Sequence, residues 1–442
     1  MHWFNTYINC GPFVAVVCVA AAGLSVFWQV AFENKDLSHP GWVIVRRKKK
    51  LVGVGSVPFQ QPPERMLALR LLSLSIAALL SGEARGAAAV RQPGDASWWL
   101  TTGDQKSLLQ KQASLSFNAT LTHPVVNVND ALKYQQIDGF GCTFTGGSAA
   151  VINQLPKDQK DALMQELFSQ ENLSTDNRIG ISYLRISMGA SDLSDHVFSY
   201  DDMPAGQTDM PLAHFSLGPD LTDLVPLLKQ VMSLNPHMKI IATPWSAPLW
   251  MKDNNNSVGG HLQRQYYDAY ANYFVKYIQA MEAQGIPIDA VTPQNEPLNP
   301  NNNPSLSMSA TEEATFITAS LGPAFKRANI QTKIIAYDHN CDNTDYPIQV
   351  LTQAGAYTAG SAFHLYAGDV SAMSRVHYAF PDKGLYFTEQ WTGASGSFSG
   401  DLLWHIQNVI VGATRNWARN ALEWNLASNP QFQPHTPGML HL

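Results

Sequence analysis

From residue 134 onward, short apolar runs alternate with amphipathic stretches. The apolar runs predict strands at 139–145, 183–189, 239–245, 290–295, 333–338, 362–366, 385–389 and 421–426. Between them, apolar residues recur every three or four positions, which is typical of helices that bury one face. We expect such helices at 156–168, 221–232, 266–283, 311–328 and 402–413. Eight strands that alternate with helices favour an α/β fold, and specifically a (β/α)₈ TIM barrel over residues 136–435.

A doubly wound parallel sheet is the alternative for the same alternation of elements. That fold commonly carries a Gly-x-Gly-x-x-Gly turn after a strand, and no such turn follows a strand here. Ahead of the barrel, residues 91–135 contain short alternating runs at 114–117 and 125–128. These runs predict the N-terminal strands of a small side β-domain.

The first ninety residues contain two apolar segments that favour different interpretations. Residues 12–32 are apolar for about the length that crosses a bilayer, and the basic run 46–50 follows, which is the pattern of a membrane anchor. Residues 66–90 instead resemble a signal peptide, with Arg70 before a short apolar run and small residues after it. We favour the signal peptide. Residues 1–65 are then an upstream extension, and the mature protein is secreted or periplasmic.

The composition and charge of the chain indicate which kinds of partner and cofactor to expect. Hydrophobic residues make up 45% of the chain and charged residues 14%, which suits a packed soluble core. The net charge of −6 provides no broad basic surface for nucleic acid. The chain has no Cys-x-x-Cys spacing and no His-x-His on an early strand, so we expect neither a metal nor another cofactor.

Two glutamates end predicted strands of the barrel. Glu296 follows the fourth strand and Glu389 ends the seventh, so both are expected at the C-terminal rim, where barrel enzymes place their catalytic groups. The two strands lie across the barrel mouth, and a sugar between them would meet a carboxylate on each side. This arrangement suits a glycosidase in which Glu296 is the acid/base and Glu389 the nucleophile.

Other polar and aromatic residues end the remaining strands. We expect Asn295 to bind a sugar hydroxyl, Arg185 to hold a carboxylate in its ionised form, and Tyr366 to donate a hydrogen bond to Glu389. Trp245 would form the floor of the sugar site. The sixth and eighth strands add His364, Glu423, Trp424 and Asn425; of these, Glu423 is expected to pair with a basic group, and His364 equally fits a structural role.

Six motifs in order along the chain resemble glycoside hydrolase family 30. They are Ile137–Gly141, Leu184–Gly189, Pro244–Pro248, Thr292–Pro297, Phe387–Glu389 and Trp424–Ala427. The resemblance implies a retaining barrel enzyme with Glu296 and Glu389 in the roles given above. It also implies that Asp192 binds sugar hydroxyls remote from the cleaved bond. By the same resemblance, the sugar pocket is lined by Trp245, Asn295, His364, Tyr366 and Trp424.

Within that family the chain most resembles the glucosylceramidase-like branch. This resemblance implies a β-glucosidase that acts through a covalent glycosyl-enzyme on a β-glucoside, including the membrane lipid glucosylceramide, although no residue separates this substrate from β-1,6-glucan. The alternatives are an endo-β-1,6-glucanase or another β-glycanase of the family, and a non-catalytic protein that binds carbohydrate or glycolipid. The resemblance implies a chain that continues past the eighth strand, so we interpret residues 436–442 as an aberrant tail. We therefore expect the side β-sandwich to be incomplete, with open strand edges and poor stability.

Overall fold

The computed structural model describes residues 25–32, 41–48, 95–113, 115–116, 132–171, 178–393 and 396–429, with residues 431 and 434. The predicted signal peptide at 66–90, the strand expected at 125–128 and the tail at 436–442 lie outside the described residues.

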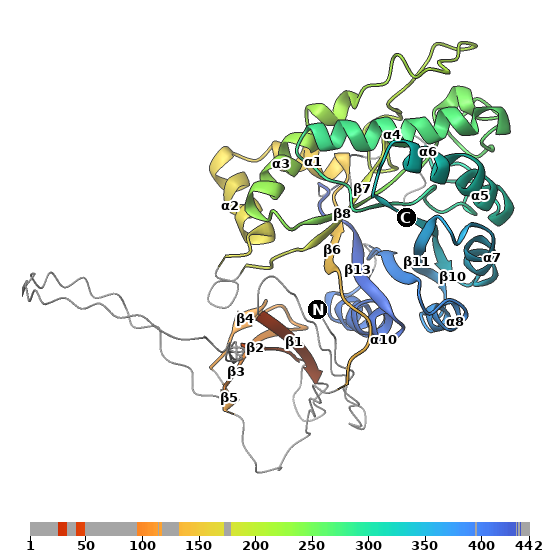
Figure 1. The fold of residues 1–442 in the computed structure, drawn as a ribbon. Coiled ribbons are helices and arrows are strands. Elements are labelled where there is room, and N and C mark those ends of the chain that lie inside the picture. The colour runs from red at the N-terminus through yellow and green to blue at the C-terminus, as the bar shows by residue number, and fades with distance from the viewer. Residues whose placement is uncertain are drawn as a thin grey trace, which may run out of the picture.

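Eight parallel strands close into a barrel, as the sequence predicts (Figure 1). In chain order they are β6 (Gly139–Thr143), β7 (Tyr183–Ser187), β8 (Lys239–Thr243), β9 (Ala290–Val291), β10 (Lys333–Cys341), β11 (Thr358–Gly368), β12 (Gly384–Glu389) and β13 (Ala418–Asn425). Only the fourth, β9, is much shorter than expected. Pro293 has no N–H for the ladder, which limits how far a regular strand extends there.

Helices cover the outside of the barrel in the expected segments. They are α1 (Gly146–Asn153), α2 (Lys157–Phe168), α3 (Leu224–Leu234), α4 (Tyr267–Ala283), α5 (Ala310–Phe316), η4 (Ile317–Leu321), α6 (Gly322–Arg327), α7 (Asp345–Ala354), α8 (Ala372–Ala379), α9 (Phe398–His405), η5 (Ile406–Gly412) and α10 (Ala413–Arg415), with short turns η1 (Gly218–Leu221), η2 (Leu249–Met251) and η3 (Arg264–Tyr266). Two of the five predicted helices are interrupted by π-helical turns, η4 and η5.

Side chains fill the barrel interior, so the barrel is a solid platform and not a pore. One buried layer takes a residue from each of seven strands: Tyr183, Ile241, Ala290, Ile335, Ala362, Tyr386 and Leu422. At the N-terminal end, Asp138 accepts hydrogen bonds from Lys239 at 2.6 Å and Arg419 at 2.8 Å. The polar residues at the C-terminal strand ends therefore rest on a packed and cross-linked base.

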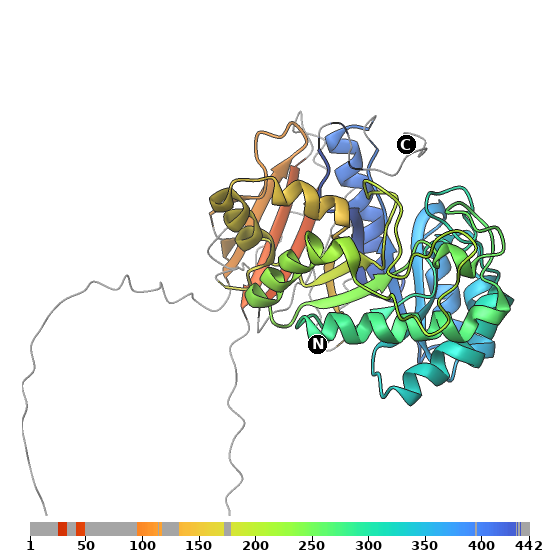
Figure 2. The same ribbon diagram turned by 90° about the horizontal axis from the view of Figure 1, so that it is seen from above.

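A small antiparallel sheet lies beside the barrel (Figures 1 and 2). It contains β1 (Ser25–Phe32), β2 (Gly41–Lys48), β3 (Asp95–Thr102), β4 (Gln110–Lys111) and β5 (Leu115–Ser116). Within the apolar segment 12–32, residues 25–32 form the strand β1 and not a helix. Among the residues that the structure describes, no helix is long and apolar enough to cross a membrane.

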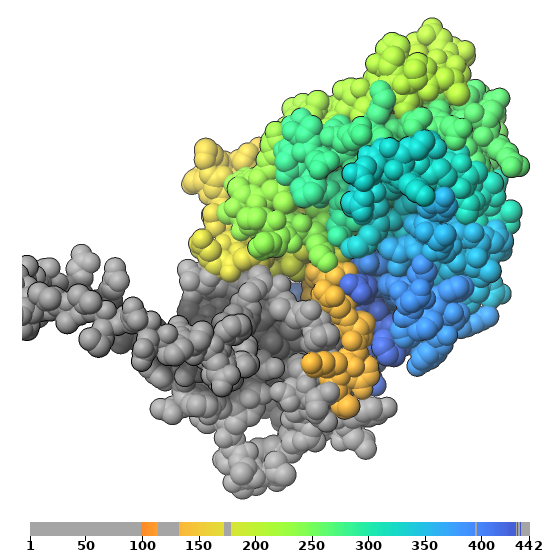
Figure 3. All heavy atoms as spheres, in the orientation of Figure 1, coloured from red at the N-terminus to blue at the C-terminus, as the bar shows by residue number. Residues whose placement is uncertain are grey.

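The basic residues Arg46, Arg47 and Lys48 belong to β2, which pairs with both β1 and β3. The strand β3 consequently has a partner on one side in β2 and on the other in β4 and β5, so the open edges expected for it are not observed. The segment that leads into the barrel packs against α10 and β13 (Figure 3), where Gln135 Nε2 donates to Thr414 O at 2.6 Å and Ala418 O at 3.1 Å.

Candidate active site

Strands β9 and β12 bring Glu296 and Glu389 to the C-terminal end of the barrel. Glu389 is the last residue of β12 and 6% exposed, and Glu296 follows β9 and is 8% exposed. Glu296 has a φ of +45°, a conformation that non-glycine residues adopt uncommonly, and its backbone N–H donates to Asp338 O at 3.0 Å. Strain of this kind is often found where a side chain must point into a functional site.

Arg185 and Tyr366 hold the carboxylate of Glu389 from two sides. Arg185 Nη1 donates to Glu389 Oε2, and the Tyr366 hydroxyl donates to Oε1 at 2.9 Å. Arg185 is fully buried and also donates through Nη2 to Asn295 Oδ1 at 2.6 Å. The expected contacts of Arg185 with a carboxylate and of Tyr366 with Glu389 are therefore both present.

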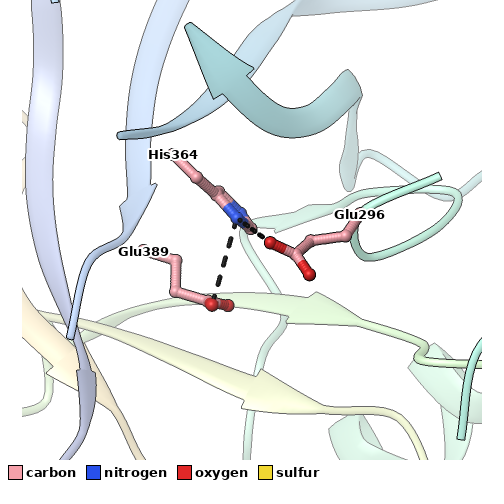
Figure 4. Close-up of side chains that lie close together, drawn as sticks. All are labelled: Glu296, His364 and Glu389. Atoms are coloured by element: carbon pink, nitrogen blue, oxygen red, sulfur yellow. Dashed lines mark hydrogen bonds and ion pairs between the residues drawn. The ribbon is translucent and has the colours of Figure 1, made fainter. Parts of the chain in front are cut away.

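His364 lies between the two glutamates (Figure 4). Its Nδ1 is 3.3 Å from Glu296 Oε1 and 4.0 Å from Glu389 Oε1. One oxygen of each carboxylate and this nitrogen all lie within 4.8 Å of one another. On the far side of the ring, Nε2 is 3.1 Å from Asp338 Oδ1, and the whole residue is buried.

Asp338 is a central residue of the site that the sequence prediction missed. It lies in β10 with no exposed surface, and accepts hydrogen bonds from Arg185 at 2.9 Å and from Thr388 at 2.6 Å. Thr292 also donates to it, at 2.9 Å. Asp338 follows the apolar run 334–337, so the same search for polar strand ends that selected Glu389 would have found it.

The charges of the cluster are strongly coupled. Burial raises the pKa of Glu296, but the hydrogen bond with His364, the charges of His364 and His339 and the hydrogen bond with Asn299 together outweigh it and hold that pKa at about 2. Burial lowers the pKa of His364, yet the charge of Glu389 and the bond with Asp338 raise it to about 9. Burial raises the pKa of Glu389, opposed by the charges of His364 and Arg185. The imidazole therefore holds the proton that lies between the two carboxylates.

Aromatic rings and a fourth acid, Asp192, complete the surroundings. The rings of Trp245 and Trp424 lie with centroids 5.4 Å apart, and the Arg185 guanidinium carbon is 4.9 Å from the Trp245 centroid. Asp192 is 6% exposed, and its Oδ1 has no hydrogen-bond partner among the described residues. Burial and the charges of Glu389 and Glu296 raise the pKa of Asp192 to about 7, so Asp192 is electrostatically linked to both.

Two residues from the eighth strand contribute elsewhere. Asn425 Oδ1 accepts from Thr145 at 2.7 Å and from Ser148 at 2.5 Å, so Asn425 fastens β13 to the start of α1. Glu423 pairs with His405 at 2.8 Å, which is the basic partner expected for it. Asn425 and Glu423 therefore hold the elements around the site in place and do not contact Glu296 or Glu389 in these hydrogen bonds.

Two further residues touch Glu296 and were not selected from the sequence. Asn299 Nδ2 donates to Glu296 Oε2 at 2.8 Å. His339 Nδ1 is 3.9 Å from Glu296 Oε1, is buried, and has no hydrogen-bond partner among the described residues. Asn299 and His339 both lie near strand ends, where the backbone is irregular or strained. The spacing of apolar residues does not indicate where a side chain points in such a segment.

Comparison with known proteins places this site in a family. A family model described as the glycosyl hydrolase family 30 TIM-barrel domain matches residues 137–436. An endo-1,6-beta-D-glucanase from Neurospora crassa is 37% identical over 69% of this chain and 63% of its own length. Lysosomal acid glucosylceramidase from Mus musculus is 27% identical over 73% of this chain and 65% of its own length.

A solved endo-beta-1,6-glucanase structure superposes with a TM-score of 0.73 and 34% identity, covering 79% of this chain and 78% of that one. The chain spans less than two thirds of the length of the curated β-1,6-glucanases that it matches.

Proposed function

The chain belongs to glycosyl hydrolase family 30, and on that premise we propose that it is a retaining β-glycoside hydrolase that cleaves β-1,6-linked glucan. The observation that carries the proposal is the pair of buried carboxylates at the C-terminal end of the barrel, with one oxygen of each within 4.8 Å of the other. Retaining glycosidases hold their two carboxyl groups about 5–5.5 Å apart, whereas inverting enzymes leave room for water at about 6.5–9.5 Å.

Glu389 is the proposed nucleophile because its contacts favour a fixed and ionised carboxylate. Arg185 and Tyr366 each donate to a different oxygen, which orients the group toward the space that it shares with Glu296. Its attack on the anomeric carbon would form a glycosyl-enzyme, and the positive charge of Arg185 would then stabilise the carboxylate as it leaves again.

Glu296 is the proposed acid/base, and it must carry a proton when the glycosidic bond breaks. The pKa directions of the two glutamates are the reverse of those that the two roles require, since that of Glu296 is lowered and that of Glu389 is raised. His364 holds the nearby proton, and its Nδ1 is 3.3 Å from Glu296 Oε1. We propose that this proton passes from the imidazole to Glu296 before it reaches the leaving oxygen.

The proposed substrate is β-1,6-glucan, whereas the resemblance found in the sequence alone implied a β-glucoside such as glucosylceramide. Similarity to β-1,6-glucanases is higher, at 37% identity, than to the mouse glucosylceramidase, at 27%. A solved β-1,6-glucanase also superposes over most of the chain. These comparisons favour a β-1,6-glucan as substrate over a glycolipid.

The test is a direct comparison of substrates with purified full-length protein. Linear β-1,6-glucan, β-1,3-glucan and glucosylceramide in detergent are each incubated with it, and reducing sugar or free ceramide is measured. We expect release of β-1,6-linked oligosaccharides, with the β-anomer formed first by proton NMR. Cleavage of glucosylceramide alone would overturn the substrate, and first formation of the α-anomer would overturn the retaining mechanism.

A further inference from the structure

We propose that Glu296, His364 and Glu389, with His339 as a fourth ligand, form a zinc-binding site through which Zn²⁺ blocks the active site. The inhibition rests on the function proposed above, whereas the binding of zinc does not. The proposal starts from the convergence in Figure 4, where one imidazole nitrogen and two carboxylate oxygens lie within 4.8 Å of one another. Imidazole nitrogen and carboxylate oxygen are both common zinc ligands.

The spacing of these atoms is close to that of a tetrahedral site. Zinc bonds to nitrogen and oxygen are about 2.0–2.1 Å long, so two ligand atoms of a tetrahedron are about 3.4 Å apart. The distance from His364 Nδ1 to Glu296 Oε1 is 3.3 Å, and that to Glu389 Oε1 is 4.0 Å. The third pair, one oxygen from each glutamate, lies within 4.8 Å. One pair already matches, and a rotation of the Glu389 carboxylate would have to bring its oxygen closer to the other two atoms.

His364 has the outer partner that zinc-bound histidines require. A ligating histidine almost always donates its second ring N–H to a carboxylate or carbonyl, which fixes the tautomer and the ring. Here Nε2 lies 3.1 Å from Asp338 Oδ1, and Thr388 donates to the same oxygen at 2.6 Å. The ring is therefore fixed with Nδ1 toward the two glutamates.

His339 provides an independent observation that points to a ligand. The residue is 8% exposed, and its Nδ1 has no hydrogen-bond partner among the described residues. A buried imidazole nitrogen without a partner is costly. This nitrogen lies 3.9 Å from Glu296 Oε1, which is the carboxylate oxygen that His364 Nδ1 also faces. A zinc ion between the two imidazoles would satisfy it.

The charge of the cluster suits a divalent cation. Glu296, Glu389 and Asp338 are three buried carboxylates, and Arg185 is the guanidinium that contacts two of them. Zinc would displace the proton that His364 holds, and with both imidazoles neutral these four groups carry two net negative charges. Two imidazoles with two carboxylates select a borderline-soft ion such as zinc over magnesium or calcium, which prefer oxygen ligands alone.

Occupation of this site would be incompatible with hydrolysis. Zinc would use Oε1 of both glutamates, so Glu296 could not deliver a proton and Glu389 could not attack. The ion would also occupy the space in which the sugar must lie. We therefore expect zinc to compete with substrate and a chelator to restore activity.

Zinc binding is measured first without turnover, by calorimetry on the chelator-treated full-length protein with zinc chloride. We expect one ion per chain, and Co²⁺ in its place should give the visible absorption of a tetrahedral site. His339→Ala should weaken zinc affinity at least about tenfold, because loss of even an outer partner costs 10- to 100-fold. His339→Phe, which keeps the ring contact with Tyr337, should do the same if the alanine variant folds poorly.

The matched control is His261→Ala, which removes a histidine whose Nδ1 lies 3.1 Å from Glu312 on the surface. We expect it to bind zinc as the wild type does. Absence of saturable binding, or equal loss of affinity in the His261 and His339 variants, would overturn the site. Inhibition that does not raise the KM for an aryl β-glucoside would overturn the competitive block.

The two proposals fail in different ways. A chain that binds one zinc ion through His339 but hydrolyses no β-glucoside would refute the proposed function and leave the metal site in place. A chain that hydrolyses β-1,6-glucan and binds no zinc would refute the metal site alone.

Discussion

At the scale of single residues, Glu389 is the most direct test of the proposed mechanism. Glu389→Gly removes the nucleophile and leaves a space beside Arg185, so kcat should fall by at least about 10⁴-fold. Azide, a small anion, should enter that space and restore turnover as an α-glycosyl azide, identified by NMR. Arg185 keeps Asp338 as a partner at 2.9 Å, so the variant should remain folded.

A matched change at Glu296 distinguishes the two glutamates. Glu296→Ala should retain turnover of aryl β-glucosides whose leaving group needs no proton, while hydrolysis of glucan is lost. If the alanine variant is rescued by azide with inversion and the glycine variant at Glu389 is not, the two roles are exchanged.

Most of these site residues could be chosen from the sequence, and the reason is physical. A polar residue at the end of a buried strand is costly unless it is used, so Glu389, Arg185 and His364 are conspicuous in the sequence. Asn299 and His339 are not, because nothing in the pattern shows that a loop or a strained strand end directs them at Glu296. The sequence also gave no sign that His364 joins the two carboxylates.

At the scale of elements, the loop after β9 controls the acid/base through one amide. Asn299 Nδ2 donates to Glu296 Oε2 at 2.8 Å, and this bond lowers the pKa of Glu296. Asn299→Ala removes the bond, so the pKa of Glu296 should rise and the proton that His364 holds should pass to Glu296 more readily. The kcat for glucan, whose leaving oxygen needs that proton, should rise by up to about tenfold. The alkaline limb of the kcat/KM profile should stay in place, because His364 holds the proton there. A fall in kcat would contradict this.

Contact between β11 and β12 gives a second prediction at this scale. A Cβ on Gly360 would lie 1.8 Å from Gly384 O, a backbone atom that cannot move aside without parting the two strands. Because β11 carries His364 and β12 carries Glu389, Gly360→Ala should lose both stability and activity. We expect the free energy of unfolding in urea to fall by more than about 3 kcal/mol.

The control is Gly146→Ala at the start of α1, where the nearest atom to an added Cβ is at 3.8 Å. That variant should unfold within about 0.5 kcal/mol of the wild type. Equal stability of the two variants would show that the strands tolerate separation at Gly360.

The elements themselves differ in how well the sequence predicts them. The spacing of apolar residues predicts the barrel strands and helices, because each of these elements must bury one or both of its faces against a neighbour. Residues 25–32 left two interpretations open, because a continuous apolar run fits a membrane helix and a buried strand equally well. Val26, Phe27 and Trp28 favour a strand, and the pairing with β2 decides it.

At the scale of the whole molecule, buried acids determine how stability varies with pH. Burial raises the pKa of Asp220 from 3.8 to about 7, although Tyr200 donates to it, and burial likewise raises that of Glu313 from 4.5 to about 7. Between about pH 4 and 7 these groups hold protons in the folded chain but not in the unfolded one. Stability therefore falls as pH rises through that window.

Other buried acids act in the opposite direction below that window. Burial raises the pKa of Asp138, but Arg419 and Lys239 outweigh it, and the pKa of Asp338 is lowered in the same way by Arg185 and His364. These carboxylates are ionised when folded, so their stabilisation is present above about pH 4 and is lost as the pH falls below it.

Together these groups predict a maximum of stability near about pH 4 to 5, with a decline toward pH 7. The decline should have a slope of up to about 1.4 kcal/mol per pH unit for each acid that keeps its proton. Urea unfolding at several pH values measures it. Asp220→Asn replaces a protonated acid by a neutral side chain of the same shape, so its slope between pH 4 and 7 should be shallower than that of the wild type. A wild-type stability that rises from pH 5 to 7 would mean that Asp220 and Glu313 are ionised in the fold, and that their burial is balanced by contacts other than a bound proton.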